Sequence, residues 1–205
     1  MKKVRLDSVS IEITRRCNMK CPHCLCGDAQ DIDINKKDIR NLLKCVFEIR
    51  ILTFTGGEPS LNVKAIRYIL KLIKQYNILV EEFVIITNGS KSSIHPDFIK
   101  VCQELYEHQM KDACEEYQGH MLFMSNDEYH DKTHQEEVHN VLSQYPVYRK
   151  RFTDYAPIRL LKQGRSKTGY EIGEKTIGLD CDYVFGTVFL SATGYILAEP
   201  DYSYD

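Results

Sequence analysis

The 205-residue chain has no long hydrophobic run, no excess of charge of one sign and no signal peptide. No apolar stretch approaches the ~20 residues that a membrane-spanning helix needs, and the basic start at residues 1–5 precedes no apolar segment. The 27 basic and 29 acidic residues leave a net charge of -2, which gives no electrostatic support for binding to nucleic acid or to a membrane surface. We therefore expect a cytoplasmic protein without a membrane partner.

Cysteine, by contrast, is present eight times, and in a reducing cytoplasm this favours metal binding or catalysis over disulfides. Cys17, Cys21 and Cys24 form a C-x3-C-x2-C motif directly after the apolar stretch 9–13. Three thiolates this close in sequence can close around one metal centre, but they leave one position of a tetrahedral or cubane site open. Because chemistry takes place at an open coordination position, this motif is the first candidate for the functional site.

The chain alternates between strand and helix patterns, which is typical of a parallel α/β sheet. Its length suits one domain, and we expect a single core domain over 1–205. The pattern is regular in 1–145 and weaker in 146–205, the candidate substrate-side extension, where 162–180 has the composition of an irregular loop. The predicted strands cover 8–14, 49–55, 83–87 and 121–125, the predicted helices cover 36–47, 62–76, 96–117 and 131–144, a fifth strand falls within 146–160, and a hairpin pairs 184–190 with 195–197.

Polar motifs follow four of the predicted strands, at the point where each strand ends. The carboxyl ends of parallel strands meet at one edge of the sheet, so these motifs are expected to form one site. The motifs are Cys17–Cys24, Gly56-Gly57-Glu58, Thr87-Asn88-Gly89 and Ser125-Asn126-Asp127.

Two of these motifs together resemble a known family. The run Cys-Asn-Met-Lys-Cys-Pro-His-Cys at 17–24, followed by Thr-Gly-Gly-Glu-Pro at 55–59, is similar to the radical S-adenosylmethionine (radical SAM) superfamily. The pattern of that family is CxxxCx(aromatic)C after the first barrel strand and GGEP after the second. The resemblance covers residues 8–130 well and the remainder loosely. It implies an α/β fold, a partial (β/α)6 TIM-like barrel, here with a C-terminal β-hairpin.

The resemblance implies that Cys17, Cys21 and Cys24 each bind one iron of a single [4Fe-4S] cluster. S-adenosylmethionine would chelate the fourth iron through its amino and carboxylate groups. His23 occupies the aromatic position of the family, which leans against the cluster or the adenine, and its alternative is a rim histidine with no special task. Cys181 and the hairpin faintly resemble the start of an auxiliary-cluster extension, but no second cysteine follows the hairpin, so we expect only one cluster.

The glycine motif is expected to bind the same cofactor. Gly56 and Gly57 let the backbone pass close to it, which a residue with a Cβ permits less easily. Glu58 is the natural acceptor for the methionine ammonium, through a charge-assisted contact.

Later strand ends supply candidate contacts to the ribose and to a carboxylate. Ser125 and Asp127, with Thr87 and Asn88, offer acceptors for the ribose hydroxyls, and a strand-end capping role is the alternative for each. Arg165, in a Gln-Gly-Arg-Ser turn similar to a late turn of some family barrels, is a candidate for the carboxylate or else an exposed loop arginine.

Tyr129 and His130 are the candidate catalytic residues, as donors of a proton or hydrogen atom or as groups that orient the substrate. The alternative is a solvated turn before the next helix.

The implied activity is radical chemistry on a substrate that the sequence does not identify. An external one-electron donor such as flavodoxin or ferredoxin reduces the cluster, and cleavage of S-adenosylmethionine gives a 5′-deoxyadenosyl radical that takes a hydrogen atom. A peptide or protein substrate is the first expectation and a small molecule the second, by analogy only. Two other functions stay open: a family member that binds cluster and cofactor without turnover, and a structural zinc site in which Cys26 or His23 completes four ligands.

Overall fold

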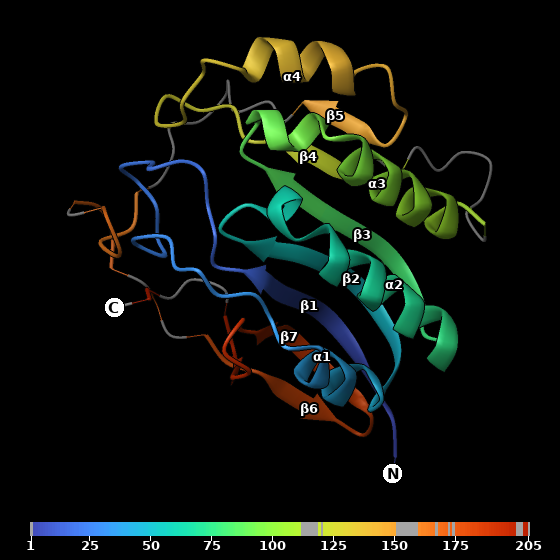
Figure 1. Cartoon of the computed structure of the whole chain (residues 1–205). Helices are drawn as coiled ribbons and strands as arrows, with labels where there is room; N and C mark the ends of the chain where they lie inside the picture. Colours follow the sequence, from blue (N-terminus) through green and yellow to red (C-terminus); the bar gives the residue numbers. More distant parts are fainter. Residues whose placement is uncertain are drawn as a thin grey trace.

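The computed structural model describes residues 2–111, 119, 121–150, 160–166, 168–171, 173, 175–199 and 203–204. Strands and helices alternate along most of the chain (Figure 1). The elements are β1 Val4–Thr14, α1 Lys36–Leu43, β2 Val46–Gly56, α2 Val63–Tyr76, β3 Leu79–Thr87, α3 Pro96–Gln109, β4 Leu122–Met124, α4 Gln135–Leu142, β5 Tyr148–Lys150, β6 Gly178–Asp180, β7 Tyr183–Leu190 and β8 Ile196–Leu197, with short 3-10 turns η1 Pro59–Asn62 and η2 Lys91–Ile94.

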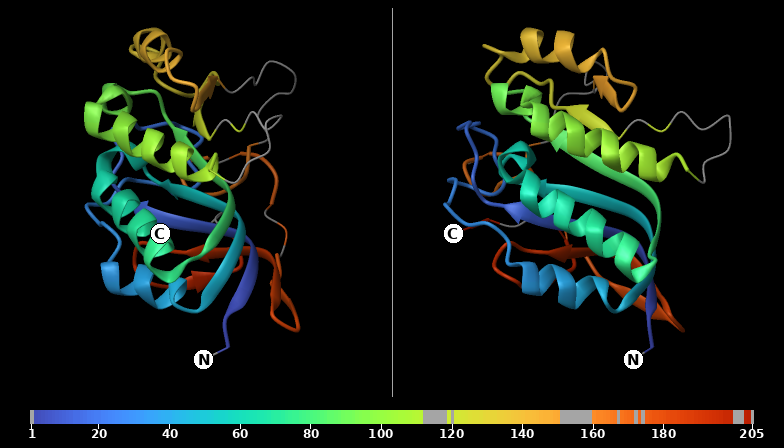
Figure 2. Two further views of the ribbon diagram at one scale, coloured as in Figure 1. Left: turned by 90° about the vertical axis from the view of Figure 1, so that its right-hand side faces the viewer. Right: turned by 45° about the vertical axis from the view of Figure 1, so that its right-hand side comes forward.

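The strands form one open sheet in the order β5-β4-β3-β2-β1-β7-β6, with β8 paired to β7. Strands β1 to β5 are parallel neighbours, and β7 also runs parallel to β1. Helices α1, α2 and α3 lie on one face of the sheet (Figure 2). The expected α/β class is confirmed, with an open sheet of the partial-barrel type. The sixth parallel strand is β7, the first strand of the hairpin. Because β7 lies beside β1, the hairpin late in the chain packs against the first described strand.

The ends of the helices follow from local chemistry. The Asn35 side chain accepts a hydrogen bond from the Lys37 amide at the start of α1. The helix ends at Leu43 and not at the predicted residue 47, because Val46 already pairs with Val4 across the sheet. Helix α2 has the predicted bounds within one residue and ends at a left-handed asparagine.

Other elements differ from their predicted bounds. Helix α4 begins at Gln135, because the Asp131 side chain binds the Thr133 amide and holds the preceding residues in a turn. Helix α3 ends at Gln109, and the rest of its predicted length, 112–118, lies outside the described residues. The fifth predicted strand exists as β5, while 151–159 also lie outside the described residues. Strand β6 was not predicted; it pairs with β7 within a segment whose composition is that of a loop.

The hydrophobic core fills the space between the sheet and its helices. Phe54 and Phe83 on β2 and β3 are fully buried with ring centroids 6.1 Å apart, and Phe98 and Ile66 close over them from α3 and α2. This core holds the strands rigidly, so that their carboxyl ends form a fixed platform for the loops that follow. In the part of the chain that the structure describes, no helix is long and apolar enough to cross a membrane.

Truncation of a core ring tests this packing. Phe83→Ala is expected to lower the free energy of unfolding by about 3–5 kcal/mol, since it removes a fully buried ring and leaves a cavity. The control Phe185→Ala, at a ring that is 43% exposed on β7, should cost less than about 1 kcal/mol. Urea denaturation measures both, and equal losses would show that the core lies elsewhere.

Candidate functional site

The glycine turn after β2 is bonded to the backbone that leads into the cysteine motif. The Gly57 amide donates to the Thr14 carbonyl at 2.8 Å, and the Glu58 amide donates to the Arg16 carbonyl at 2.9 Å. A Cβ on Gly56 would overlap the Thr14 carbonyl oxygen, and a Cβ on Gly57 would overlap that of Arg16. The close approach that requires glycine is therefore to the chain itself, whereas the sequence predicted an approach to the cofactor. These two bonds fix where the cysteine motif begins.

Glu58 joins the glycine turn to the end of β3. Its side chain is fully buried and accepts hydrogen bonds from the Ser60 amide, the Thr87 hydroxyl and the Asn88 amide at 3.1, 2.8 and 2.8 Å. Burial raises the pKa of this carboxyl, although the three donors oppose the shift. A carboxylate has about four acceptor sites, so these three donors leave room for one further donor such as the methionine ammonium. That role of Glu58 and the ribose role of Thr87 stay predictions, and the Thr87 hydroxyl also makes a contact of the strand-end kind that was its alternative.

The three cysteines of the motif are free, partly buried thiols. Burial raises the pKa of Cys17; burial and the neighbouring Cys17 and Cys24 raise the pKa of Cys21 to about 11. The Asn88 amide nitrogen lies 3.8 Å from Cys17 Sγ as a donor. Because metals bind thiolates, a metal entering this site has to displace the protons of Cys17 and Cys21.

Cys26, which the zinc alternative uses as a fourth ligand, is a hydrogen-bond donor to Cys24. The Cys26 thiol lowers the pKa of Cys24 to about 5, with a further contribution from the Arg165 guanidinium. The Cys26 carbonyl accepts the Tyr204 amide at 2.9 Å, and the bond to Cys24 together with burial raises the pKa of the Cys26 thiol. Cys26 therefore supports Cys24, a candidate cluster ligand, as its hydrogen-bond partner.

A late turn covers the third cysteine. The Arg165 amide donates to the Cys24 carbonyl at 2.9 Å, and the Gln163 side chain donates to the Leu25 carbonyl at 3.2 Å. Gly164 has a φ of 59°, and a Cβ there would overlap both carbonyls. Arg165 is thus brought to the motif from far along the chain, and its contact with a carboxylate of the cofactor stays a prediction.

Four predicted residues meet beside Cys21. His130 Nδ1 lies 2.6 Å from Asp127 Oδ2, and the His23 ring lies 5.0 Å, between centroids, from both the His130 and the Tyr129 rings. Burial raises the pKa of Asp127, but the contact with His130, the hydrogen bond from the Tyr129 amide and the nearby His23 together outweigh it, so that the pKa lies below its ordinary value. Burial lowers the pKa of His23. The four side chains therefore meet in one corner, where the His23 ring lies against the turn at 127–130.

This corner opens into a pocket of about 350 Å³ lined by Met19, Lys20, Cys21, Tyr129, His130 and Asp131. Ser125 is the remaining ribose candidate. Its carbonyl accepts a hydrogen bond from the Gln135 side-chain amide at 2.9 Å, and the same amide donates to the Asn88 carbonyl at 3.4 Å. Gln135 is buried and links two predicted strand-end motifs. The sequence did not single it out, because a glutamine in the first turn of a helix has no distinctive pattern.

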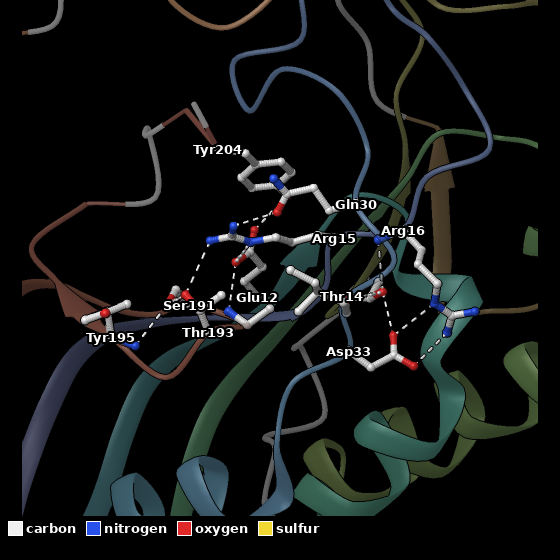
Figure 3. A network of polar contacts seen from close by, with 12 residues as sticks. Glu12, Thr14, Arg15, Arg16, Gln30, Asp33, Ser191, Thr193, Tyr195 and Tyr204 are labelled. Carbon is white, nitrogen blue, oxygen red and sulfur yellow. Dashed lines mark hydrogen bonds and ion pairs between the residues drawn. The ribbon is translucent and has the colours of Figure 1, made fainter.

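A buried carboxylate on β1 was also missed. Glu12 is 1% exposed and accepts from Arg15 Nε, the Ala192 amide and the Tyr204 hydroxyl at 3.2, 2.8 and 2.7 Å (Figure 3). The Arg15 guanidinium also lies over the Tyr204 ring, 4.2 Å from its centroid. One signal could have found it: Glu12 interrupts the apolar stretch 9–13, and a charge within a buried strand needs partners.

The opposite side of the same strand end carries a second polar group. The Asp33 carboxylate accepts from the Thr14 hydroxyl at 2.7 Å and pairs with Arg16 at 2.9 Å (Figure 3). Residues 12–16 are therefore held from both sides immediately before Cys17.

Comparisons with known proteins agree with this geometry. A family model described as the radical SAM superfamily matches residues 11–143. Among curated proteins, YfkA of Bacillus subtilis is 40% identical over 76 residues, which cover 35% of this chain and 20% of YfkA. YydG of Bacillus subtilis, whose name assigns it provisionally to peptide biosynthesis, is 30% identical over 88 residues, 40% of this chain and 26% of YydG. A GTP 3′,8-cyclase of Clostridium acetobutylicum is 33% identical over 90 residues, 41% of this chain and 28% of the cyclase.

Solved structures share the fold. Two structures of anSMEcpe, one of the histidine-tagged protein with bound AdoMet and one of the native protein with AdoMet and the Cp18Cys peptide, each superpose with a TM-score of 0.51. They are 16% and 17% identical, and the superposition covers 71% of this chain and 43% and 42% of theirs. The matched region thus spans less than half of each solved relative and less than a third of each curated one.

The Asp127–His130 pair predicts a pH-dependent contribution to stability. Because the folded pKa of Asp127 lies below the ordinary 3.8, its ionised form stabilises the fold above that value, and the stabilisation is lost as the pH falls through the folded pKa. Asp127→Asn is expected to be less stable near neutral pH, with the deficit shrinking below about pH 4. Denaturant unfolding of both proteins across this range measures the deficit, and a deficit that stays constant with pH contradicts the assignment.

Proposed function

The chain belongs to the radical SAM superfamily, and on this premise we propose that it is an enzyme that uses one [4Fe-4S] cluster and S-adenosylmethionine to modify a peptide. The observation that carries the proposal is the placement of the cysteine motif: it begins at the end of β1, is bonded to the glycine turn at the end of β2, and is covered by the 163–165 turn.

The donor set fits a cluster better than a single zinc ion. Among the described residues, one group of three has potential ligand atoms within 4.8 Å of one another, and it consists of Cys21, His23 and His130. The sulfurs of the three cysteines do not form such a group. Four ligands about 2.3 Å from one zinc ion would be less than about 4 Å apart. Wider spacing of the thiols suits the larger cubane, and Cys26 is already bonded to Cys24. The spacing of the three cysteines therefore disfavours a zinc ion bound by all of them.

When bound, the cluster and S-adenosylmethionine supply a one-electron cleavage whose radical product takes a hydrogen atom from the substrate. Cys17, Cys21 and Cys24 would hold the cluster, and the fixed backbone at residues 12–16 would keep them in place. The residues that we propose to line the cofactor are His23, Gly56, Gly57, Glu58, Thr87, Asn88, Ser125, Asp127 and Arg165. Glu58 also fixes Asn88 through a buried hydrogen bond.

Tyr129 and His130 are proposed to meet the substrate. Both line the 350 Å³ pocket beside Cys21. The contact of His130 Nδ1 with Asp127 orients the ring and leaves Nε2 as the atom that can give or take a proton. Asp127 accepts the Tyr129 and His130 amides as well, at 2.9 and 3.2 Å, so it holds both candidates at one turn.

A peptide is the substrate class that we favour over a small molecule. The provisional assignment of YydG to peptide biosynthesis supports it, and one anSMEcpe structure contains a peptide. Relatives named as GTP 3′,8-cyclases keep a nucleotide as the second candidate.

We further propose flavodoxin or ferredoxin as the external electron donor. We also propose the cytoplasm as the location, and the free thiols of the described cysteines support this location. The division into a core and a substrate-side extension at 146–205 stays a prediction.

Substitution of one cysteine tests the cluster. After anaerobic reconstitution, the natural protein should be brown and hold about four iron ions per chain. Cys21→Ala should lose the iron and the colour, because a ligand is removed, whereas the matched control Cys26→Ala should keep both, because Cys26 is only a donor to Cys24. Iron analysis and visible absorption decide, and a colourless natural protein or a Cys21→Ala protein with full iron would refute the cluster assignment.

Cofactor cleavage tests the enzyme. With dithionite and S-adenosylmethionine, the reconstituted protein should release 5′-deoxyadenosine, measured by liquid chromatography. Cleavage should persist in His130→Gln, while hydrogen transfer to a peptide substrate should fall by about 10²-fold or more if His130 handles a proton. An intact cluster without any 5′-deoxyadenosine would instead identify a member that binds without turnover.

A further inference from the structure

The three cysteine sulfurs differ in the side-chain donors that reach them from distant elements. Cys17 Sγ accepts from the Asn88 amide at 3.8 Å. The Arg165 backbone amide donates to the Cys24 carbonyl at 2.9 Å, which holds the Arg165 guanidinium beside Cys24 Sγ. Cys21 faces the His23 and His130 rings across the pocket, and among the described residues no side-chain hydrogen bond to its sulfur is found. Two of the three cluster ligands therefore have a distant side-chain donor beside them, whereas Cys21 has, among the described residues, only the charge of Arg165 at longer range.

The Asn88 amide is fixed with its nitrogen toward the motif. Its oxygen accepts the Ser90 amide at 3.0 Å, so its nitrogen must face the other way, where it also donates to Asn18 Oδ1 at 2.9 Å. Its own backbone amide is bound to Glu58, and the residue is 7% exposed. This side chain has no freedom to turn away from Cys17.

Arg165 is fixed in a similar way beside Cys24. Its backbone amide is bonded to the Cys24 carbonyl, and the guanidinium lies beside Cys24, with Asp28 Oδ1 at 3.8 Å as a counter-charge. Its Nε is buried, with no hydrogen-bond partner among the residues that the structure describes. The positive charge is thus held at the motif with an unused donor, and an unsatisfied buried donor costs free energy unless a ligand meets it.

We propose that Asn88 and Arg165 set the reduction potential of the cluster, by donating hydrogen bonds, and in Arg165 a positive charge, to the sulfurs of Cys17 and Cys24. The inference deepens the proposed function and rests on its cluster. When an external donor gives up one electron and the cluster takes it up, negative charge grows on the iron and sulfur atoms. Donors and a cation beside those sulfurs stabilise the reduced form, which raises the potential.

The potential itself is the test, because a merely structural residue would not shift it. We would reconstitute the full chain as the natural protein, Asn88→Ser, Arg165→Lys and Arg165→Gln, and titrate each cluster without S-adenosylmethionine, following the reduced form by electron paramagnetic resonance. All three variants should have more negative midpoint potentials. The shift should be largest for Arg165→Gln, which loses charge and donor, and smaller for Arg165→Lys, which keeps the charge.

Arg67→Gln is the matched control. It removes the same charge from α2, where Arg67 is partly exposed and paired with Asp97, so the potential should not move. Iron content separates the possible failures. A natural protein without iron refutes the proposed function; full iron with potentials equal to those of the control overturns this inference alone. If Arg165→Gln does not hold the cluster, unshifted potentials in Arg165→Lys and Asn88→Ser overturn the inference equally.

Discussion

Two backbone hydrogen bonds, from Gly57 to Thr14 and from Glu58 to Arg16, are the constraint on which the rest of the site depends. They continue the pairing of β1 with β2 beyond the last ladder bond and deliver both polar motifs to one point. Only glycine permits this approach, because a Cβ at either glycine would overlap a carbonyl oxygen. The cysteine motif therefore starts from a rigid position, although its own residues form neither helix nor strand.

Two buried carboxylates reinforce that position. Glu58 ties the glycine turn to the end of β3, and Glu12 ties β1 to the segments around Ala192 and Tyr204. A buried carboxylate is costly unless donors surround it, and each of these two has three. Each carboxylate thus connects the cluster motif to elements far away in sequence. Loss of a donor at either carboxylate would therefore weaken the contacts that hold the motif in position.

The sequence was sufficient for the alternating elements, the parallel sheet and the strand-end placement of the motifs, since apolar periodicity and turn residues encode these locally. The Asp127–His130 and His23–Tyr129 contacts also followed from strand-end placement. The sequence was insufficient where the partners of a residue lie far away along the chain. Nothing local shows that Glu12 meets Tyr204, that Gly164 lies on Cys24, or that β7 pairs with β1. The contacts of Glu58 with Thr87 and Asn88 are of the same kind, because both partners lie at the end of β3.

The position of β7 has a consequence for the order in which the molecule assembles. Strand β1 is synthesised long before β7, yet the two strands are neighbours in the sheet. During synthesis β1 can pair with β2 early, but its other edge stays open until residues 183–190 emerge, and closing so long a loop is slow. Glu12 lies on this strand and receives the Ala192 and Tyr204 donors only afterwards. The base of the cysteine motif thus becomes fully bonded only after residues 183–204 have been made, although its own residues are translated long before them.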